Sequence, residues 1–158
     1  MSSAFPVTKW AGIKGLRDMV GMDPNKIRDR IMAEDHGFTE AHLPFQAQQL
    51  LALFLSKGQI DMDRYIDRKT EVARGNAKSG GSSYQTLCAV CHGIDGTEIN
   101  FKSAKYPSYV GTVCAESPRQ ALHKIRYGQP GVGMTALANQ DLEFVVDILA
   151  YCQKLPVE

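Results

Sequence analysis

Two cysteines and a histidine lie within five consecutive positions near the middle of the chain. The stretch TLCAVCHGIDG contains Cys88, Cys91 and His92, although the 158 residues include only four cysteines and four histidines. A C-x-x-C pair alone is typical of a dithiol redox site or of half a zinc site. A zinc site needs two more ligands, and Cys114 and Cys152 stand alone, without a second C-x-x-C or an H-x-x-H pair. A thioredoxin-like site needs βαβ surroundings, and strand signals are scarce in this sequence.

The histidine that directly follows the second cysteine indicates a third chemistry. Cys88 and Cys91 lie one helical turn apart, so that their thiols can form thioethers to the two vinyl groups of haem. His92 is then held beneath the ring as an axial iron ligand. The motif therefore predicts one covalently bound haem c, attached through Cys88 and Cys91.

The sequence around this motif resembles a known family. YQTLCAVCHGIDG, followed by YPSYVG, IRYGQPGVGMTAL and LEFVVDILAYCQKLP, is similar to the monohaem c-type cytochromes of the bacterial class I type, over about residues 80–156. In that family an aromatic residue four positions before the first cysteine packs on the last helix. The resemblance therefore implies that Tyr84 faces Leu149 or Tyr151.

The resemblance also implies roles for two residues after the motif. In the family a proline gives its backbone carbonyl to the ring N–H of the haem histidine, which fixes the tautomer of that ring. Pro107 matches this proline, and Arg126 is likewise assigned to the haem pocket.

The second axial ligand of the iron can be argued by elimination. Met134 is the only one of six methionines that follows the haem motif, and it lies in the glycine-rich loop GQPGVGM, which is too irregular for a core segment. The usual Met-Pro of the family is Met-Thr here, which leaves the sulfur unchanged. His123 lies on the polar side of its expected helix, and His36 and His42 belong to the other half of the chain, so these histidines are the alternatives to Met134.

Cys114 and Cys152 remain after the motif is assigned. Covalent haem attachment takes place on the oxidising side of a membrane, where spare thiols pair readily. A disulfide between them would close a loop of about 38 residues and contribute roughly 3 to 4 kcal/mol. The alternative is two separately buried cysteines that act as small hydrophobic residues.

Helix start and stop signals recur along the chain and predict an all-α fold. Residues 117–128 begin with Ser117 as N-cap, followed by proline, and stop at a glycine. Residues 139–155 begin with Asn139 as N-cap and present an apolar stripe before Pro156. Two earlier segments, 23–37 and 43–58, have the same form. We therefore expect a cytochrome c-like helical domain preceded by a smaller helical region.

The two pairs of expected helices are also related in sequence. Setting each residue n against n+94 aligns residues 23–57 with 117–151 without a gap, and proline, isoleucine and leucine positions coincide. Such a match is expected of an internal repeat whose first copy lacks the haem motif, or of two unrelated amphipathic hairpins. This predicts a helical extension at 1–60, a polar connector at 61–79 and a cytochrome c domain at 80–158.

Composition excludes several classes of partner. Lys and Arg number 18 against 17 for Asp and Glu, so the net charge of +1 gives no reason to expect nucleic acid. The longest apolar run is about six residues, whereas a membrane span needs roughly 20. The start MSSAFPVTKW lacks the basic and apolar regions of a secretory signal.

The expected function follows from the expected ligands. A haem iron with His and Met on both faces has no open position for a substrate, so we expect a periplasmic single-electron carrier and no enzyme. Its partners would be transient redox proteins: a dehydrogenase or bc-type donor and an oxidase or reductase. The alternatives are a haem subunit of a larger oxidoreductase, docked stably through the N-terminal half, and a haem gas sensor.

Overall fold

The chain forms two compact units, Met1–Asp61 and Met62–Glu158. The structure is a computed structural model that describes residues 16–129 and 131–157. Helices make up the regular structure of both units, and the described residues contain no β-strand, only three isolated β-bridges. The expected all-α class is confirmed. Residues 1–15 of the expected extension lie outside the described residues.

The first unit is a helical hairpin with short 3₁₀ and π segments. Its elements are η1 (Leu16–Met19), α1 (Pro24–Ile31), η2 (Glu34–His36), α2 (Phe45–Leu53) and the π-helical turn η3 (Phe54–Gly58). The Asp23 carboxylate accepts a hydrogen bond from the Asn25 amide at 2.9 Å and so caps α1. The small core consists of Met19, Ile27, Ile31, Ala52 and Leu55.

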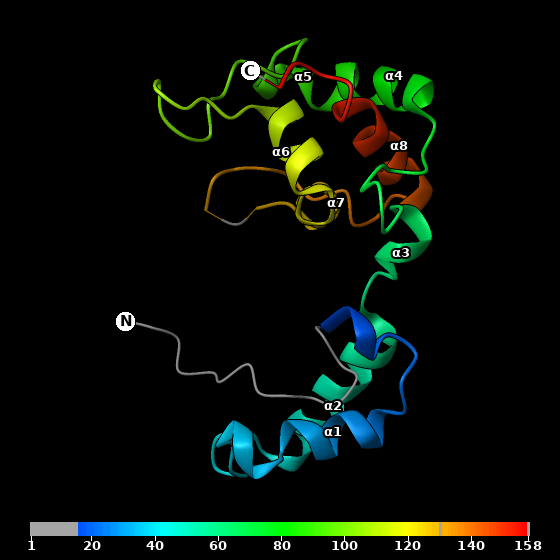
Figure 1. Cartoon of the computed structure of the whole chain (residues 1–158), viewed down its shortest axis with the longest axis vertical. Helices are drawn as coiled ribbons and strands as arrows, with labels where there is room; N and C mark the ends of the chain where they lie inside the picture. The colour runs from blue at the N-terminus through cyan, green and yellow to red at the C-terminus, as the bar shows by residue number, and fades with distance from the viewer. Residues whose placement is uncertain (1–15, 130, 158) are drawn as a thin grey trace. The chain divides into compact units, whose positions relative to one another are not determined.

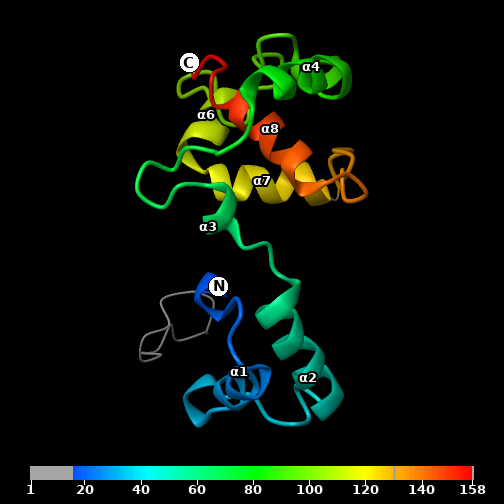
Figure 2. The same cartoon turned by 90° about the vertical axis from the view of Figure 1, so that its right-hand side faces the viewer.

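The described residues of the second unit form six helices and include the C-x-x-C-H motif. They are α3 (Met62–Tyr65), α4 (Ala77–Leu87), α5 (Ala89–His92), α6 (Val110–Glu116), α7 (Pro118–Tyr127) and α8 (Leu142–Cys152). The last helix, α8, is the centre of this unit and packs against α4, α6 and α7 (Figures 1 and 2). Its side chains Val145, Val146, Ile148 and Leu149 are all buried.

The helices α4 and α8 cross where α4 has a glycine. A Cβ atom on Gly80 would lie 1.8 Å from the backbone oxygen of Asp147, so no side chain fits at this point. Asp147 also accepts a hydrogen bond from the Asn76 amide at 2.6 Å, just before α4 begins. The crossing of these two helices therefore depends on Gly80, the first residue of the domain expected at 80–158.

The expected connector at 61–79 differs from what the structure shows. These residues belong to the second unit, and Ile66 and Ala73 are buried in it. The Gln153 side chain at the end of α8 holds the segment by accepting from the Ala73 amide and donating to the Glu71 carbonyl, both at 2.9 Å. The polar composition of residues 61–79 suggested a linker. The segment is held in the unit by hydrogen bonds to its backbone, and such bonds leave no apolar pattern in the sequence.

Two of the predicted helix starts can be compared with the structure. The helix α7 begins at Pro118 after Ser117 and ends before Gly128, as predicted, although the Ser117 side chain makes no capping hydrogen bond. The start predicted at Asn139 is wrong, because α8 begins at Leu142 with Asp141 as its N-cap.

The offset of 94 residues relates the buried positions of the two hairpins as well as their sequences. The helices α1 and α7 begin at corresponding prolines, Pro24 and Pro118. Four buried residues of the first unit, Ile27, Ile31, Ala52 and Leu55, correspond to four buried residues of the second, Ala121, Ile125, Val146 and Leu149. The internal repeat therefore remains a prediction to which the matching burial pattern adds weight.

Within the described ranges, no helix combines the length and the apolar character needed to cross a membrane.

Candidate functional site

The C-x-x-C-H motif lies where one helix ends and another begins. The Asn76 side chain caps α4 by accepting from the amides of Lys78 and Ser79 at 3.0 and 3.3 Å. The helix ends at Leu87, Cys88 forms the junction, and α5 continues to His92. Gly93 then adopts φ of +80°, a conformation that favours glycine and ends the short helix.

The two motif thiols differ in exposure. Cys88 is half-buried, Cys91 is exposed, and both are free thiols. Burial raises the pKa of Cys88 to about 11, with smaller contributions from Cys114 and Cys91. Cys88 therefore stays protonated at neutral pH, while Cys91 faces solvent.

His92 has one buried ring nitrogen without a partner. Nδ1 is buried and makes no hydrogen bond to any described residue. Burial lowers the pKa of His92, which favours the neutral imidazole at neutral pH. The ring meets Phe101 edge-on, with centroids 6.0 Å apart. Because an unsatisfied buried polar atom destabilises a fold by about 1 to 3 kcal/mol, Nδ1 marks an incomplete interaction.

The expected bond between Pro107 and His92 is not present. His92 Nδ1 has no acceptor in the described structure, so the Pro107 carbonyl does not receive it. The segment that carries Pro107 closes on itself instead: the Phe101 amide donates to the Ser108 carbonyl at 2.8 Å, and the Asn100 side chain accepts from the Ser108 amide at 3.0 Å. These bonds place Phe101, and not a carbonyl, beside the imidazole.

Tyr84 packs on the last helix, as the resemblance implied. Its ring lies 5.3 Å from that of Tyr151, and the side chain is fully buried. Its hydroxyl donates to the Gly93 carbonyl at 2.9 Å, directly after the motif. Burial raises the pKa of Tyr84 well above its usual value. Tyr84 therefore links the end of the motif to α8.

The loop that carries Met134 is fixed at both ends. Met134 is partly buried, and its carbonyl accepts from the Gln129 amide at 3.2 Å. A Cβ atom on Gly128 would lie 2.5 Å from the same carbonyl oxygen, so only a glycine fits at position 128. These contacts hold the backbone of Met134 against the end of α7.

Arg126 closes the other end of this loop. Its Nη1 atom donates to the Leu137 carbonyl at 3.1 Å and also to the Gln140 carbonyl. Arg126 therefore spans the loop that contains Met134, and its expected haem contact stays a prediction.

The remaining histidines make local contacts. His123 is exposed and stacks on Tyr127 with centroids 4.8 Å apart, which agrees with the predicted solvated position. His36 Nδ1 lies 2.7 Å from the Arg30 carbonyl, and His42 Nδ1 lies 3.1 Å from the Thr39 hydroxyl. Both belong to the first unit.

Cys114 and Cys152 come together in the core of the second unit. They are 3% and 2% exposed, and both are free. Cys114 lies on α6. The side chain of Cys114 hydrogen-bonds to Cys152 and, together with burial, raises the pKa of Cys152 far above its usual value. The two thiols are therefore neighbours, and not separately buried.

Two residues of the site carried no signal in the sequence analysis. Phe101 was missed because nothing in the motif marks an aromatic nine positions after His92. Gly96 was missed although it lies in the quoted stretch: its φ is +80°, and a Cβ atom there would approach the Leu155 side chain to 2.9 Å. The glycine itself was the one signal in the sequence for this positive φ and close approach.

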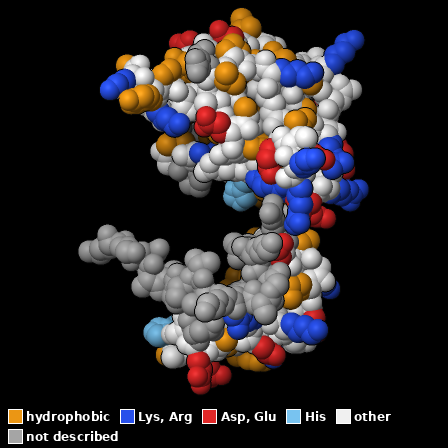
Figure 3. Space-filling view, in the orientation of Figure 1, with side chains coloured by type: hydrophobic (Ala, Val, Ile, Leu, Met, Phe, Trp, Pro, Cys, Tyr) orange, Lys and Arg blue, Asp and Glu red, His pale blue; other side chains and the backbone are white. Residues whose placement is uncertain are grey.

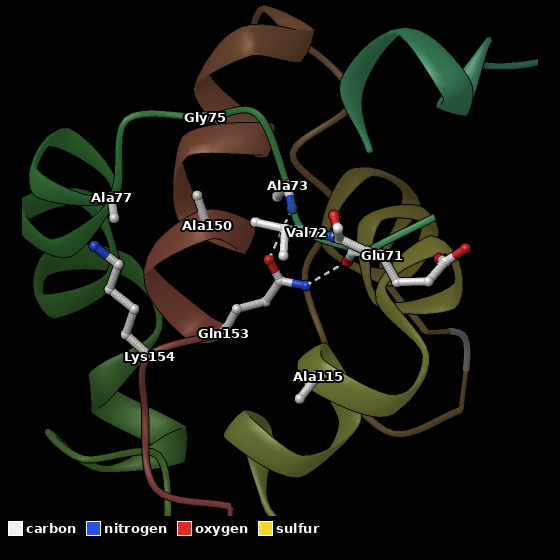
Figure 4. A pocket seen from close by; sticks show the side chains of 10 residues that line it. Glu71, Val72, Ala73, Gly75, Ala77, Ala115, Ala150, Gln153 and Lys154 are labelled. Carbon is white, nitrogen blue, oxygen red and sulfur yellow. Dashed lines mark hydrogen bonds between the residues drawn. The ribbon is translucent and has the colours of Figure 1, made fainter. Parts of the chain in front are cut away.

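A hollow of about 490 Å³ lies elsewhere on the second unit, lined by the segment 70–77 and the ends of α6 and α8. Figure 4 shows the Gln153 amide inside it, bonded to Ala73 and Glu71, with small side chains such as Ala115 and Ala150 around it. The motif residues and Met134 are not among its lining. This hollow lies where residues 70–77 pack on α6 and α8.

Histidine, cysteine and acidic side chains do not gather in threes around a possible metal ion anywhere in the described chain. No known protein family, no curated protein and no solved structure matches the chain.

Proposed function

We propose that the second unit is a c-type cytochrome domain that carries single electrons. One haem would be attached through Cys88 and Cys91, with His92 and Met134 as axial ligands of its iron. The observation that carries this proposal is His92, a half-buried neutral imidazole with an unpartnered Nδ1 directly after two free thiols. Neutral imidazole is the form that binds a metal.

The residues around the motif fit such a group. Two free thiols at this spacing meet the need for two thioether bonds. Apolar side chains beside them lie open to solvent: Val90 is 84% exposed and Ile94 is 76% exposed. Apolar side chains also reach the surface of this unit in Figure 3. Covering them with an apolar ring would contribute about 25 cal/mol for each Å² removed from water.

The chain's own residues would hold and tune the group. Tyr84 would keep the motif fixed to α8 through its bond to the Gly93 carbonyl. Arg126 and Gly128 would fix the loop that presents the Met134 sulfur. A haem held by His92 and Met134 would supply reversible one-electron chemistry. With both axial positions filled, the protein acts as a carrier and not as an enzyme.

The place of action follows from the attachment chemistry. We infer a periplasmic protein, because thioether attachment and disulfides belong to the oxidising side of a membrane. The donor would be a dehydrogenase or bc-type protein and the acceptor an oxidase or reductase, in small transient encounters.

The direct test is to remove the attachment thiols. The full chain should be expressed together with a haem-attachment system, and its haem extracted with acidic acetone. We expect the haem to stay with the wild-type chain and to be lost from the Cys88→Ala/Cys91→Ala variant. A wild-type chain without covalent haem would overturn the proposal.

The second axial ligand is tested separately. Met134→Ala should open the iron to carbon monoxide, while the wild type should bind it slowly because a protein ligand must first leave. Fast binding to the wild type would contradict Met134 ligation and favour the gas-sensor alternative. If Met134→Ala bound carbon monoxide as slowly as the wild type, the second axial ligand would be sought among His123, His36 and His42.

A second candidate is a haem subunit of a larger oxidoreductase, docked through the first unit. The observation in its favour is a group of large apolar side chains that are exposed on α2 and η3: Phe45, Leu50, Leu51, Leu53 and Phe54. Such a concentration of exposed apolar side chains on two short elements is typical of a surface that a partner covers. Leu50→Glu should leave the unfolding temperature unchanged but abolish co-purification with the partner enzyme, whereas unaltered co-purification would exclude this face.

A further inference from the structure

His92 is held firmly along its backbone, whereas its ring has no hydrogen bond at Nδ1. The His92 amide donates to the Cys88 carbonyl at 3.0 Å, and its carbonyl accepts from the Glu98 amide at 3.1 Å. The buried Nδ1 atom makes no hydrogen bond to any described residue. Rotation about the bond that joins Cβ to the imidazole is broad unless a neighbouring group restricts it. Packing against a neighbouring side chain can set the plane of the ring in place of such a bond.

Phe101 supplies a contact of this kind. The centroids of the two rings are 6.0 Å apart, and their planes meet at 61°. Aromatic rings attract one another in this edge-on arrangement at such distances, and the attraction depends on their relative orientation. Phe101 is also 46% exposed. Its ring therefore adds little to the core, and its removal should leave the fold of the unit intact.

The loop between α5 and α6, which Figure 1 shows projecting from the helices, fixes the backbone of Phe101. The Phe101 amide donates to the carbonyl of Ser108, which is buried, at 2.8 Å. The preceding side chain, Asn100, accepts from the amides of Lys102 and Ser108, both at 3.0 Å. It also donates to the Ser103 carbonyl at 3.1 Å. One asparagine thus holds the chain on both sides of Phe101.

The base of this loop is joined to the backbone of His92 itself. The Glu98 amide binds the His92 carbonyl directly after α5, and the Val110 amide donates to the Gly96 carbonyl at 3.2 Å where α6 begins. Phe101 therefore stands on a framework of hydrogen bonds that starts at the residue whose ring it contacts.

We propose that Phe101 is a positioning residue for His92: its ring holds the imidazole plane at one angle, so that the axial ligand is oriented before haem is bound. The proposal rests on the proposed function for the role of His92 as an iron ligand. A ligating histidine is commonly oriented by a hydrogen bond to its second nitrogen, and here a ring contact takes that task. The orientation itself needs no haem and can be measured without it.

The first test uses the full chain without haem, with carbon-13 in its histidine rings. The ring signal of His92 is identified by its loss in His92→Gln. We expect the order parameter of its ring C–H bond to be about 0.85 in the wild type and below about 0.6 in Phe101→Ala. Phe101→Tyr keeps an aromatic ring at this position and should keep the order.

Tyr106→Ala is the matched control. Tyr106 is another exposed aromatic residue of the same loop, and its ring lies 5.2 Å from the Lys105 ammonium. Its removal should leave the order parameter of the His92 ring unchanged. Both alanine variants should unfold at the same temperature, because neither ring belongs to the core. An equally ordered His92 ring in Phe101→Ala and the wild type would overturn the proposal, and so would an equal loss of order in Tyr106→Ala.

The haem-loaded proteins give a second readout. The electron paramagnetic resonance of low-spin ferric iron depends on the angle of the axial imidazole plane. Phe101→Ala should shift and broaden the signal at the largest g value, Phe101→Tyr should restore it, and Tyr106→Ala should leave it unchanged. Covalent haem in the wild type with the same signal in Phe101→Ala defeats only this inference. A wild type without covalent haem defeats only the proposed function, because the order of the ring is measured on the haem-free chain.

Discussion

Burial shifts the pKa values of side chains around the motif more than neighbouring charges do. Cys88 and His92 are shifted in opposite directions by the same cause: loss of solvent disfavours the thiolate of one and the imidazolium of the other. Both side chains are therefore neutral at neutral pH. A neutral thiol and a neutral imidazole are the species that the proposed attachment and ligation begin from.

Arg126 acts on the proposed site through the loop that it spans, which leads to a prediction. Replacing it by glutamine removes the guanidinium bonds to the carbonyls of Leu137 and Gln140. A hydrogen bond from a charged group contributes about 1.5 to 3 kcal/mol, so the loop should open at least tenfold more often. Hydrogen exchange at the Gln129 and Leu137 amides measures this opening. Lys124→Gln, on the same turn of α7, is the matched control and should leave both amides unchanged; equal exchange in the two variants would contradict the role of Arg126.

At the scale of elements, the crossing of α4 and α8 organises the second unit. The crossing places Tyr84 against Tyr151 and so fixes where the motif begins. Cys152 is the last residue of the same helix, α8, and is buried. The position of the C-x-x-C-H motif therefore depends on this helix contact.

This crossing can be tested at its glycine. Gly80→Ala places a Cβ atom 1.8 Å from the Asp147 carbonyl oxygen, a backbone atom that cannot move aside cheaply. We expect a loss of about 3 kcal/mol, because overpacking outweighs the higher helix propensity of alanine. The near-ultraviolet circular dichroism of the packed tyrosines reports on the unfolding of this unit. Ser82→Ala, exposed on the same helix, should change stability by less than about 0.5 kcal/mol, and an equally mild Gly80→Ala would refute the close crossing.

Sequence patterns predicted helices well where apolar spacing coincides with start and stop residues, as in α7. They failed where structure is held by particular hydrogen bonds. The segment 61–79 belongs to the second unit because Gln153 binds its backbone, and no periodicity records a side chain that lies about 80 residues away. Pro107 does not accept a hydrogen bond from His92 in this structure, where local bonds of Asn100 and Ser108 fix the loop, and its expected role beside a haem stays a prediction.

The C-x-x-C-H motif could be recognised from residue spacing, and the packing of Tyr84 on the last helix was predicted from the family resemblance. The pairing of Cys114 with Cys152 was only one of two alternatives, since the sequence does not show that α6 exists. Close approaches such as that of Gly111 to Pro156 involve residues far apart in the chain, which is why the sequence could not decide between them.

At the scale of the whole molecule, few charges bear on stability in alkaline solution. The net charge at neutral pH is only +1, so overall repulsion is small. The buried acids of the second unit are different, because Cys88, Tyr84 and Cys152 all have pKa values raised above those of the unfolded chain. Each keeps its proton in the folded state at a pH where the unfolded chain loses it.

The reduced, haem-free chain should therefore become less stable as pH rises above about 9. The folded state binds more protons than the unfolded state in this range, so the free energy of unfolding falls with pH; it is unaffected by these groups below the unfolded values. Between pH 8 and pH 10 we expect a loss of about 2 kcal/mol, measured as a fall in the urea midpoint of the near-ultraviolet signal. Oxidising Cys114 and Cys152 to a disulfide removes both thiols, and with them the contribution of Cys152, so the oxidised chain should lose less. A midpoint that stays constant from pH 8 to pH 10 in the reduced chain would mean that these three groups reach solvent and are not held in the core.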